Sequence, residues 1–135
     1  MRLNQVTLPA LDVALSVAFY RRLGFVQIVD APHYARFDTG SDSDVGGASG
    51  ASFSLHRHEG DLPLQAAVIY FEDDDLDATV QRLHAAGIEF TQMPRDEPWL
   101  WREARLQDPA GNTLCLYRAG VNRLHPPWRM PAPAA

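Results

Sequence analysis

Short segments of this chain alternate between apolar and polar residues, and turn residues separate each segment from the next. In the first half, the predicted strands are residues 3–8, 25–29, 34–37 and 51–58. Between the first two strands, apolar residues recur at helical spacing, with Asp12 placed to cap a helix and Gly24 to end it. The first half therefore has the order strand, helix and three strands.

The second half has the same order. Its predicted strands are residues 66–71, 88–92, 99–106 and 114–117. Its helix starts at the acidic run 73–75 and ends at Gly87, and we interpret the acids as favourable first-turn charges rather than as a cation site. Residues 50–56 (GASFSLH) are echoed by residues 111–117 (GNTLCLY), and repetition at this scale predicts two copies of one unit.

The predicted fold is α+β, with two βαβββ modules that form a cup-shaped mixed sheet and one helix per module on its outer face. The first module is residues 1–60 and the second is residues 61–120, with the boundary at the short linker 60–63. Each half alone would be marginally stable, so we expect the two halves to fold against one another as a single domain. Residues 41–50 and 94–98 are predicted loops, the first of them mobile. The Pro-rich tail, residues 121–135, is predicted to be neither helix nor central strand and to be disordered from about Pro131.

The composition argues against several classes of partner. The net charge of −5, from 12 basic and 17 acidic residues, argues against a nucleic-acid partner, which requires a basic face. The single cysteine excludes an internal disulfide and fits a reducing cytoplasm. The sequence has neither an apolar run of transmembrane length nor a signal-peptide pattern, so we expect a cytoplasmic protein with no membrane partner.

Four short motifs have a recognisable order and spacing. They are residues 11–13 (LDV), 18–20 (AFY), 23–25 (LGF) and 108–112 (DPAGN). Together with the paired modules, these motifs resemble the vicinal oxygen chelate superfamily, which includes glyoxalase I, bleomycin-resistance proteins and extradiol dioxygenases. The resemblance covers about residues 3–118. It implies paired βαβββ modules around a small-molecule site, and a homodimer.

The resemblance also assigns positions to the metal ligands of the superfamily's enzymes. Carried over to this sequence, they are Gln5, Ser54, Ala67 and Cys115, with Gln5 matching Ala67 and Ser54 matching Cys115 across the repeat. Glyoxalase-like members have His or Gln, Glu, His and Glu there, so only Gln5 fits, and we expect no metal and no other cofactor. The alternative is a rebuilt divalent-metal site that uses His56, Glu103 and Cys115.

The face without a covering helix is the expected binding surface. Strand alternation places Ala104 and Leu106 toward the core and sends Trp101, Glu103 and Arg105 to the other side. The predicted ligand-binding residues are Gln5, Thr7, Ser54, His56, Trp99, Trp101, Glu103, Arg105, Cys115 and Tyr117. An alternative is that Glu103 and Arg105 form a surface ion pair and the tryptophans lie in a dimer interface.

Three functions follow from this surface. The first is a metal-independent protein that binds a small organic molecule, similar to the bleomycin-resistance branch; the net charge is compatible with a cationic ligand. The second is a glyoxalase-like lyase, isomerase or dioxygenase with a rebuilt metal site or with Glu103 as general base. Within that reading, Cys115 is a further candidate as nucleophile. The third is a structural dimer or accessory domain.

Overall fold

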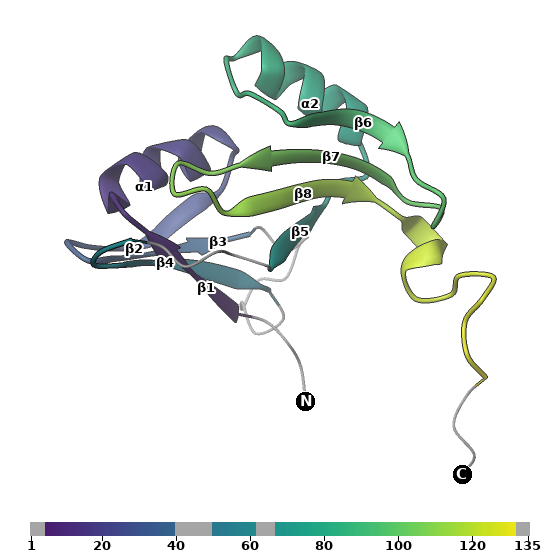
Figure 1. Cartoon of the computed structure of the whole chain (residues 1–135), viewed down its shortest axis with the longest axis horizontal. Helices are drawn as coiled ribbons and strands as arrows, with labels where there is room; N and C mark the ends of the chain where they lie inside the picture. Colours follow the sequence, from purple (N-terminus) through teal and green to yellow (C-terminus); the bar gives the residue numbers. More distant parts are fainter. Residues whose placement is uncertain (1–4, 40–49, 62–66, 132–135) are drawn as a thin grey trace. The chain divides into compact units, whose positions relative to one another are not determined.

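The computed structural model describes residues 5–39, 50–61 and 67–131, which contain eight strands and two α-helices (Figure 1). The first module contains β1 (Gln5–Ala10), α1 (Val13–Arg22), β2 (Val26–Ala31), β3 (Tyr34–Asp38) and β4 (Ser52–Arg57). The second contains β5 (Val68–Glu72), α2 (Leu76–Ala85), β6 (Gln92–Asp96), β7 (Arg102–Gln107) and β8 (Thr113–Arg118), followed by the short 3₁₀ helix η1 (Gly120–Arg123). The predicted α+β fold of two βαβββ modules is confirmed.

Each module forms one mixed sheet of four strands, in the orders β1-β4-β3-β2 and β5-β8-β7-β6. The first and last strands of a module run parallel, whereas the paired strands β2 and β3, and β6 and β7, run antiparallel. The chain divides into two compact units, one with the residues up to Ala67 and residues 107–112, the other with residues 68–106 and those from 113 onward. The turn between β7 and β8 therefore belongs to the first unit.

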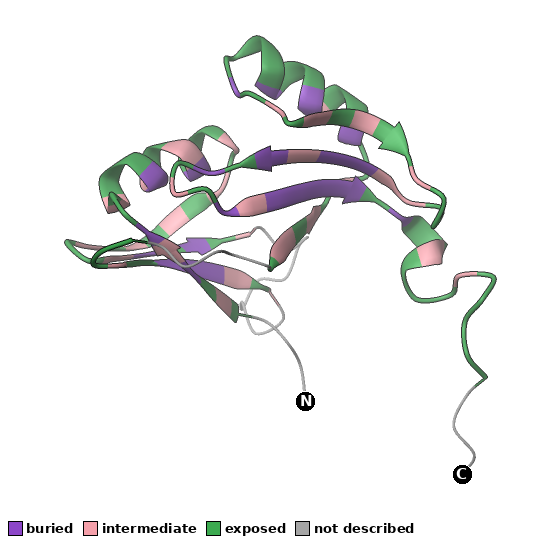
Figure 2. Ribbon diagram, in the orientation of Figure 1, coloured by how far each residue is buried: buried purple, intermediate pink, exposed green. Residues whose placement is uncertain are grey.

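An aromatic core holds α1 against the first sheet. The ring of Tyr20 lies 4.8 Å from that of Phe53, and Phe53 stacks on Phe37 at 5.1 Å between ring centroids. The predicted boundaries of α1 are correct. At its start, the Asp12 side chain accepts a hydrogen bond from the Leu15 amide at 3.0 Å, and Gly24, with a φ of 103°, follows its end. These rings fix the side of the sheet that α1 covers, and Figure 2 shows that both helices bury one side only.

The turn of residues 108–112 is built into the first unit by buried hydrogen bonds. The hydroxyl of Tyr20 donates to the Asp108 carboxylate at 2.7 Å. The Asn112 side chain donates to the same carboxylate at 2.5 Å and to the Pro9 carbonyl at 3.0 Å. Burial, followed by the charge of Asp108, raises the pKa of Tyr20, so the phenol stays a neutral donor. Two of the sequence motifs, residues 18–20 and 108–112, therefore have a structural role.

In the second unit, the acidic run precedes α2 as predicted. Asp73 accepts hydrogen bonds from the Asp75 amide at 2.8 Å and from the Thr79 hydroxyl at 2.6 Å, which orders the turn into the helix. Leu76, Val80 and Leu83 form the buried side of the helix. The acids therefore act as a helix start, in agreement with the interpretation from sequence.

One strand of the second unit was placed incorrectly. The prediction of a strand at residues 88–92 and a loop at 94–98 is wrong, because β6 covers Gln92–Asp96. β6 is an edge strand with an irregular register between Gln92 and Arg95, and at such a position the missing amide of Pro94 costs no ladder hydrogen bond. Ile88 is buried and closes the end of α2 through a 3.0 Å bond from its amide to the Leu83 carbonyl.

The tail is also more regular than predicted, because η1 forms a helical turn immediately after β8. The predictions of a mobile loop at residues 41–50 and of disorder beyond Pro131 fall almost entirely on residues 40–49 and 132–135, which lie outside the described residues. Neither α-helix in the described ranges has the length and apolar character needed to span a membrane.

Candidate functional site

The strand registers define which residues of the two modules are equivalent. In the first sheet Thr7 lies opposite Ser54, and in the second Tyr70 lies opposite Cys115. Because Ser54 and Cys115 occupy the same place in the repeated segment, Tyr70 is the counterpart of Thr7. Tyr70 was not predicted as a site residue, since the uniformly apolar sequence of its strand hides which side chains face which side.

The register also corrects the match of Gln5. Gln5 lies opposite Ser52, whereas the equivalent Thr113 lies opposite Val68. The counterpart of Gln5 is therefore Val68 and not Ala67. Neither residue offers a metal-binding atom in its side chain, so the chemical conclusion drawn from Ala67 is unchanged.

In the first unit, a chain of hydrogen bonds joins polar side chains of β1, β3 and β4. Gln5 donates from Nε2 to the Ser54 hydroxyl at 2.6 Å and accepts from the Ser52 hydroxyl. The hydroxyls of Ser54 and Tyr34 are 2.5 Å apart, and Arg36 donates from Nε to the Tyr34 hydroxyl at 2.9 Å. The hydrogen bond with Ser54 lowers the pKa of Tyr34. This cluster can bind polar groups, and alternation around the buried Ala35 and Phe37 could have identified Tyr34 and Arg36.

The remaining predicted residues of the first unit, Thr7 and His56, are exposed. The imidazole of His56 meets the ring of Tyr34 edge to face, with 6.4 Å between centroids. His56 thus lies at the border of the same polar cluster.

The second unit contains the most tightly connected group of predicted site residues. Glu103 is 1% exposed, and its carboxylate accepts hydrogen bonds from Trp99 Nε1 at 2.5 Å and from Arg105 Nη2 at 2.9 Å. The thiol of Cys115 lies 3.5 Å from the same carboxylate, and Arg105 Nη2 also donates to the Tyr70 hydroxyl at 3.3 Å. The buried carboxylate therefore holds Trp99, Arg105 and Cys115 in fixed positions.

Cys115 lacks the surroundings that activate a cysteine nucleophile. Burial raises the pKa of its thiol to about 12, and the charge of Glu103 acts in the same direction. Arg105 lowers the pKa by less. At neutral pH the side chain is a buried thiol, which reacts slowly with electrophiles.

Beside the Glu103 cluster, three aromatic rings pack together. Trp101 stacks on Tyr117 with 4.8 Å between centroids and an interplanar angle of 23°. The ring of Tyr70 meets both edge to face, at 5.9 Å from Trp101 and 5.5 Å from Tyr117. Trp101 Nε1 donates to the Asn122 carbonyl at 3.3 Å, which ties the start of the tail to the rings. Burial, followed by the charge of nearby Glu72, raises the pKa of Tyr117.

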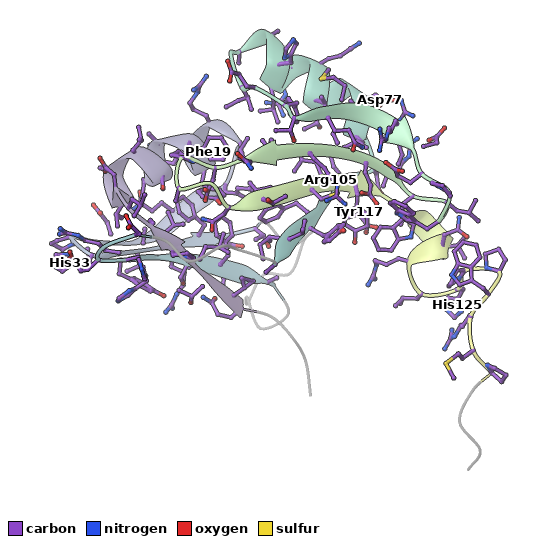
Figure 3. All side chains as sticks on the ribbon, in the orientation of Figure 1. Phe19, His33, Asp77, Arg105, Tyr117 and His125 are labelled. Carbon is purple, nitrogen blue, oxygen red and sulfur yellow. The ribbon has the colours of Figure 1, made fainter. Side chains whose placement is uncertain are left out.

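The predicted set thus divides between the units. Gln5, Thr7, Ser54 and His56 belong to the first unit, and Trp99, Trp101, Glu103, Arg105, Cys115 and Tyr117 belong to the second. Figure 3 shows Arg105 and Tyr117 on the second sheet, where they come from the neighbouring strands β7 and β8. Within each unit, hydrogen bonds or ring contacts link the predicted residues, except Thr7, which is placed only by its register opposite Ser54.

The donor groups do not fit a divalent metal. Glu103 and Cys115 meet, but the other groups around them are the guanidinium of Arg105 and the indole N–H of Trp99, which donate hydrogen bonds and cannot coordinate a cation. The thiol keeps its proton, whereas a metal requires the thiolate. In the described ranges, no three His, Cys, Asp or Glu side chains are grouped to hold a metal ion.

A groove of about 570 Å³ lies elsewhere, between α1 and β2 in the first unit. Its lining residues are Val13, Ala14, Val17, Ala18, Arg21, Gln27, Asp30, Ala31 and Pro32. The predicted ligand-binding residues are not among them. Six of the nine lining residues are apolar, the other three are Arg21, Gln27 and Asp30, and the groove lies on the helix side of the sheet.

Comparison with known proteins places these features in a family. The sequence model of the Glyoxalase/Bleomycin resistance protein/Dioxygenase superfamily matches residues 2–116. A crystal structure of a bleomycin-binding protein complexed with bleomycin has a TM-score of 0.68 at 23% identity, covering 87% of this chain and 98% of the other. A glyoxalase/bleomycin resistance protein/dioxygenase from Nocardioides has a TM-score of 0.71 at 23% identity, covering 97% and 90%. At these identities the likeness shows the fold.

One curated protein matches over a shorter stretch. The anthracycline biosynthesis protein DnrV of Streptomyces peucetius is 42% identical over 53 residues. The match covers 39% of this chain and 19% of that protein. It therefore relates one module-sized segment and not the whole relative.

Proposed function

This chain belongs to the Glyoxalase/Bleomycin resistance protein/Dioxygenase superfamily, and we propose that it binds a small, planar organic molecule without a metal, through the aromatic and polar surface of its second unit. The observation that carries the proposal is the ring cluster of Tyr70, Trp101 and Tyr117 beside Arg105. Tyr70 is 42% exposed and the Arg105 side chain 29% exposed, so a ligand can reach a phenol ring and a guanidinium together. Such surfaces bind planar groups by stacking and polar groups by hydrogen bonding.

Binding is favoured over acid–base catalysis by the surroundings of Glu103. A general base must be able to reach the proton that it removes. The carboxylate of Glu103 is buried and already accepts from Trp99 and Arg105, with the Cys115 thiol as a third neighbour. Glu103 is thus a positioning residue, which orients the indole of Trp99 and the guanidinium of Arg105 beside the proposed ligand.

Absence of a metal is the second part of the proposal. It is supported by the donor chemistry at the superfamily's ligand positions, where Gln5 and Ser54 bond to one another and Cys115 is a protonated thiol. At the position equivalent to Gln5 in the second module, neither Val68 nor Ala67 has a side-chain atom that can bind a metal. A purified protein that kept a stoichiometric divalent metal through dialysis would contradict this part.

The relatives suggest the first compounds to test. One solved relative is described as complexed with bleomycin, and the partial curated relative as an anthracycline biosynthesis protein. A panel of bleomycin, an anthracycline and simpler polycyclic aromatic compounds should be titrated by calorimetry and by tryptophan fluorescence. We expect at least one planar aromatic member to bind with a Kd below about 0.1 mM.

Two tryptophan variants locate the site. Replacement of the stacked indole in Trp101→Leu should weaken binding about fivefold or more, since stacking contributes about 1 kcal/mol or more per ring and 1.4 kcal/mol corresponds to about tenfold. Trp128→Leu is the matched control, because Trp128 lies in the tail and is 58% exposed. Equal affinity of wild type and Trp101→Leu, or no binding by any compound, would refute the proposal.

We further propose that the protein works as a homodimer in the cytoplasm. The single, buried, reduced cysteine is compatible with that compartment. Light scattering on purified protein should give twice the mass of one chain, and cell fractionation should place the protein with cytoplasmic markers. A monomer mass at micromolar concentration would contradict the first statement, and recovery with a membrane fraction the second.

A further inference from the structure

The two modules carry the same short pattern on their third strands. β3 contains Tyr34, Ala35, Arg36 and Phe37, and β7 contains Glu103, Ala104, Arg105 and Leu106. The alanine and the large apolar residue are fully buried in both strands. Because side chains alternate along a strand, both arginines lie on the sheet side opposite to these buried residues.

In each module, the side chain two positions before the arginine holds its guanidinium. Arg36 donates to Tyr34 at 2.9 Å, and Arg105 donates to Glu103 at 2.9 Å. The residue that binds the arginine also contacts the last strand of its module. Tyr34 contacts Ser54 in the first module, and Glu103 contacts Cys115 in the second. The repeat therefore conserves a held arginine while the residues that hold it differ.

Within the pair of Glu103 and Arg105, the accessible charge is positive. Glu103 is 1% exposed, whereas the side chain of Arg105 is 29% exposed, so a ligand meets the guanidinium and not the carboxylate. Among the described residues, the hydrogen bonds of Arg105 all use Nη2, which donates to Glu103 and Tyr70. A guanidinium has five N–H donors, and these two bonds use neither Nε nor Nη1.

We infer that the ligand carries a carboxylate or phenolate on an aromatic body, and that Arg105 is the residue that selects this anion. The inference rests on the proposed function and adds the charge of the ligand to it. The rings of Tyr70 and Trp101 would contact the aromatic body, with the buried Tyr117 stacked behind Trp101, while Arg105 donates charge-assisted hydrogen bonds to the anionic oxygen. A cationic ligand would meet the guanidinium as a like charge and is disfavoured.

The chain's net charge of −5 does not contradict an anionic ligand. Part of the negative charge is the run of acids at the start of α2, where Asp73 is used to order the helix turn. Glu103 is paired with Arg105 and buried, whereas Glu72 is exposed and lies opposite Tyr117 in the sheet, where the charge of Arg123 opposes its effect on Tyr117. Local exposure, rather than net charge, decides which sign the ligand meets.

A series of ligands that differ only in charge tests the inference on the wild-type protein. Anthraquinone-2-carboxylate, its carboxamide and 2-(aminomethyl)anthraquinone share one ring system and are anionic, neutral and cationic at pH 7. Calorimetry in low salt should show that the carboxylate binds at least tenfold more tightly than the carboxamide and that the amine binds most weakly. The advantage of the carboxylate should shrink as salt is added, since Arg105 is partly exposed.

Substitution then assigns the preference to one residue. Arg105→Gln should reduce the affinity for the carboxylate to that for the carboxamide and leave the carboxamide within about twofold. Arg82→Gln makes the same change in net charge on the exposed surface of α2 and should keep the tenfold preference. Arg105→Lys, which keeps the charge but not the fork of donors, should retain part of it.

The outcomes separate the inference from the proposed function. Equal affinity for carboxylate and carboxamide, or tighter binding of the amine, overturns the inference and leaves small-molecule binding intact. A carboxylate preference that survives Arg105→Gln overturns the role of Arg105. If none of the three compounds and no member of the wider panel binds, the proposed function fails and the inference fails with it. Should Arg105→Gln not fold, the wild-type series still decides the charge preference.

Discussion

Chemical labelling of Cys115 tests most directly whether this site performs nucleophilic chemistry. The reactive species is the thiolate, so the labelling rate depends on the pKa of the thiol and on its access to reagent. Burial and the charge of Glu103 raise that pKa from 9.0 to about 12. At pH 8 this shift reduces the thiolate fraction roughly a thousandfold, because each pH unit changes the fraction about tenfold.

The assay uses a thiol reagent such as Ellman's reagent on native protein and on protein unfolded in urea. Cys115 is the chain's single cysteine, so the signal reports on one group. We expect native labelling at pH 8 to be at least about a thousandfold slower than labelling of the unfolded chain. Labelling within tenfold of the unfolded rate would show an accessible thiolate, and both the protonated thiol and the binding-only interpretation would have to be abandoned.

The same shift predicts a dependence of stability on pH. The folded pKa of Cys115 lies above the unfolded value, so its contribution to stability is complete below about pH 9 and is lost as the pH rises toward about 12. Above pH 9, wild type should therefore lose up to about 1.4 kcal/mol per pH unit more than Cys115→Ala. Tyr20 also has a raised pKa and contributes equally to both proteins, whereas the pKa of Tyr117 is raised mainly by burial and Glu72, with a smaller contribution from Cys115. Parallel urea-denaturation profiles from pH 8 to 10.5 would contradict this prediction.

Three further predictions concern stability and the positioning of the site. Tyr20→Phe removes a 2.7 Å hydrogen bond to the buried Asp108 carboxylate and should lower the free energy of unfolding in urea by about 1.5–3 kcal/mol; an unchanged midpoint would contradict the role assigned to this bond. Leu100 has a φ of 68°, which strains a leucine, and it is largely exposed, so Leu100→Asn should raise the free energy of unfolding by about 0.5–1 kcal/mol, measured by the same denaturation. Glu103→Gln weakens the bond to Arg105 and should lower the free energy of unfolding by about 1–2 kcal/mol. Calorimetry should show that its affinity for an aromatic carboxylate falls only severalfold. Complete loss of a measurable turnover would instead identify Glu103 as a base.

The fold could be predicted because its signals are local and repeated. Asp12 and Gly24 mark the ends of α1 through a side-chain cap and a positive φ of 103°, and both effects act within one helical turn. β6 could not be placed, because whether a proline is tolerated depends on the neighbouring strand. Only the sheet order shows that Pro94 lies on an edge strand, where no partner needs its amide.

The site could be predicted only where alternation around buried residues was clear. Ala104 and Leu106 fix the side of β7, and so Glu103 and Arg105 were found. Tyr70 was missed, because every residue from Val68 to Phe71 is apolar or aromatic and neither period nor composition separates the two sides.

The sign of the charge that is exposed to a ligand could not be predicted from the net charge of the sequence. Net charge counts Glu103 and Arg105 as equal and opposite, although one is buried and the other is partly exposed. The asymmetry arises from side-chain length and from the partners on adjoining residues: Trp99 and Cys115 enclose the short carboxylate, while the longer guanidinium extends to Tyr70. Burial of one member of an ion pair thus converts a neutral pair into a surface of one sign. For this reason the net charge of the chain, although compatible with a cationic ligand, does not argue against the proposal of an anionic one.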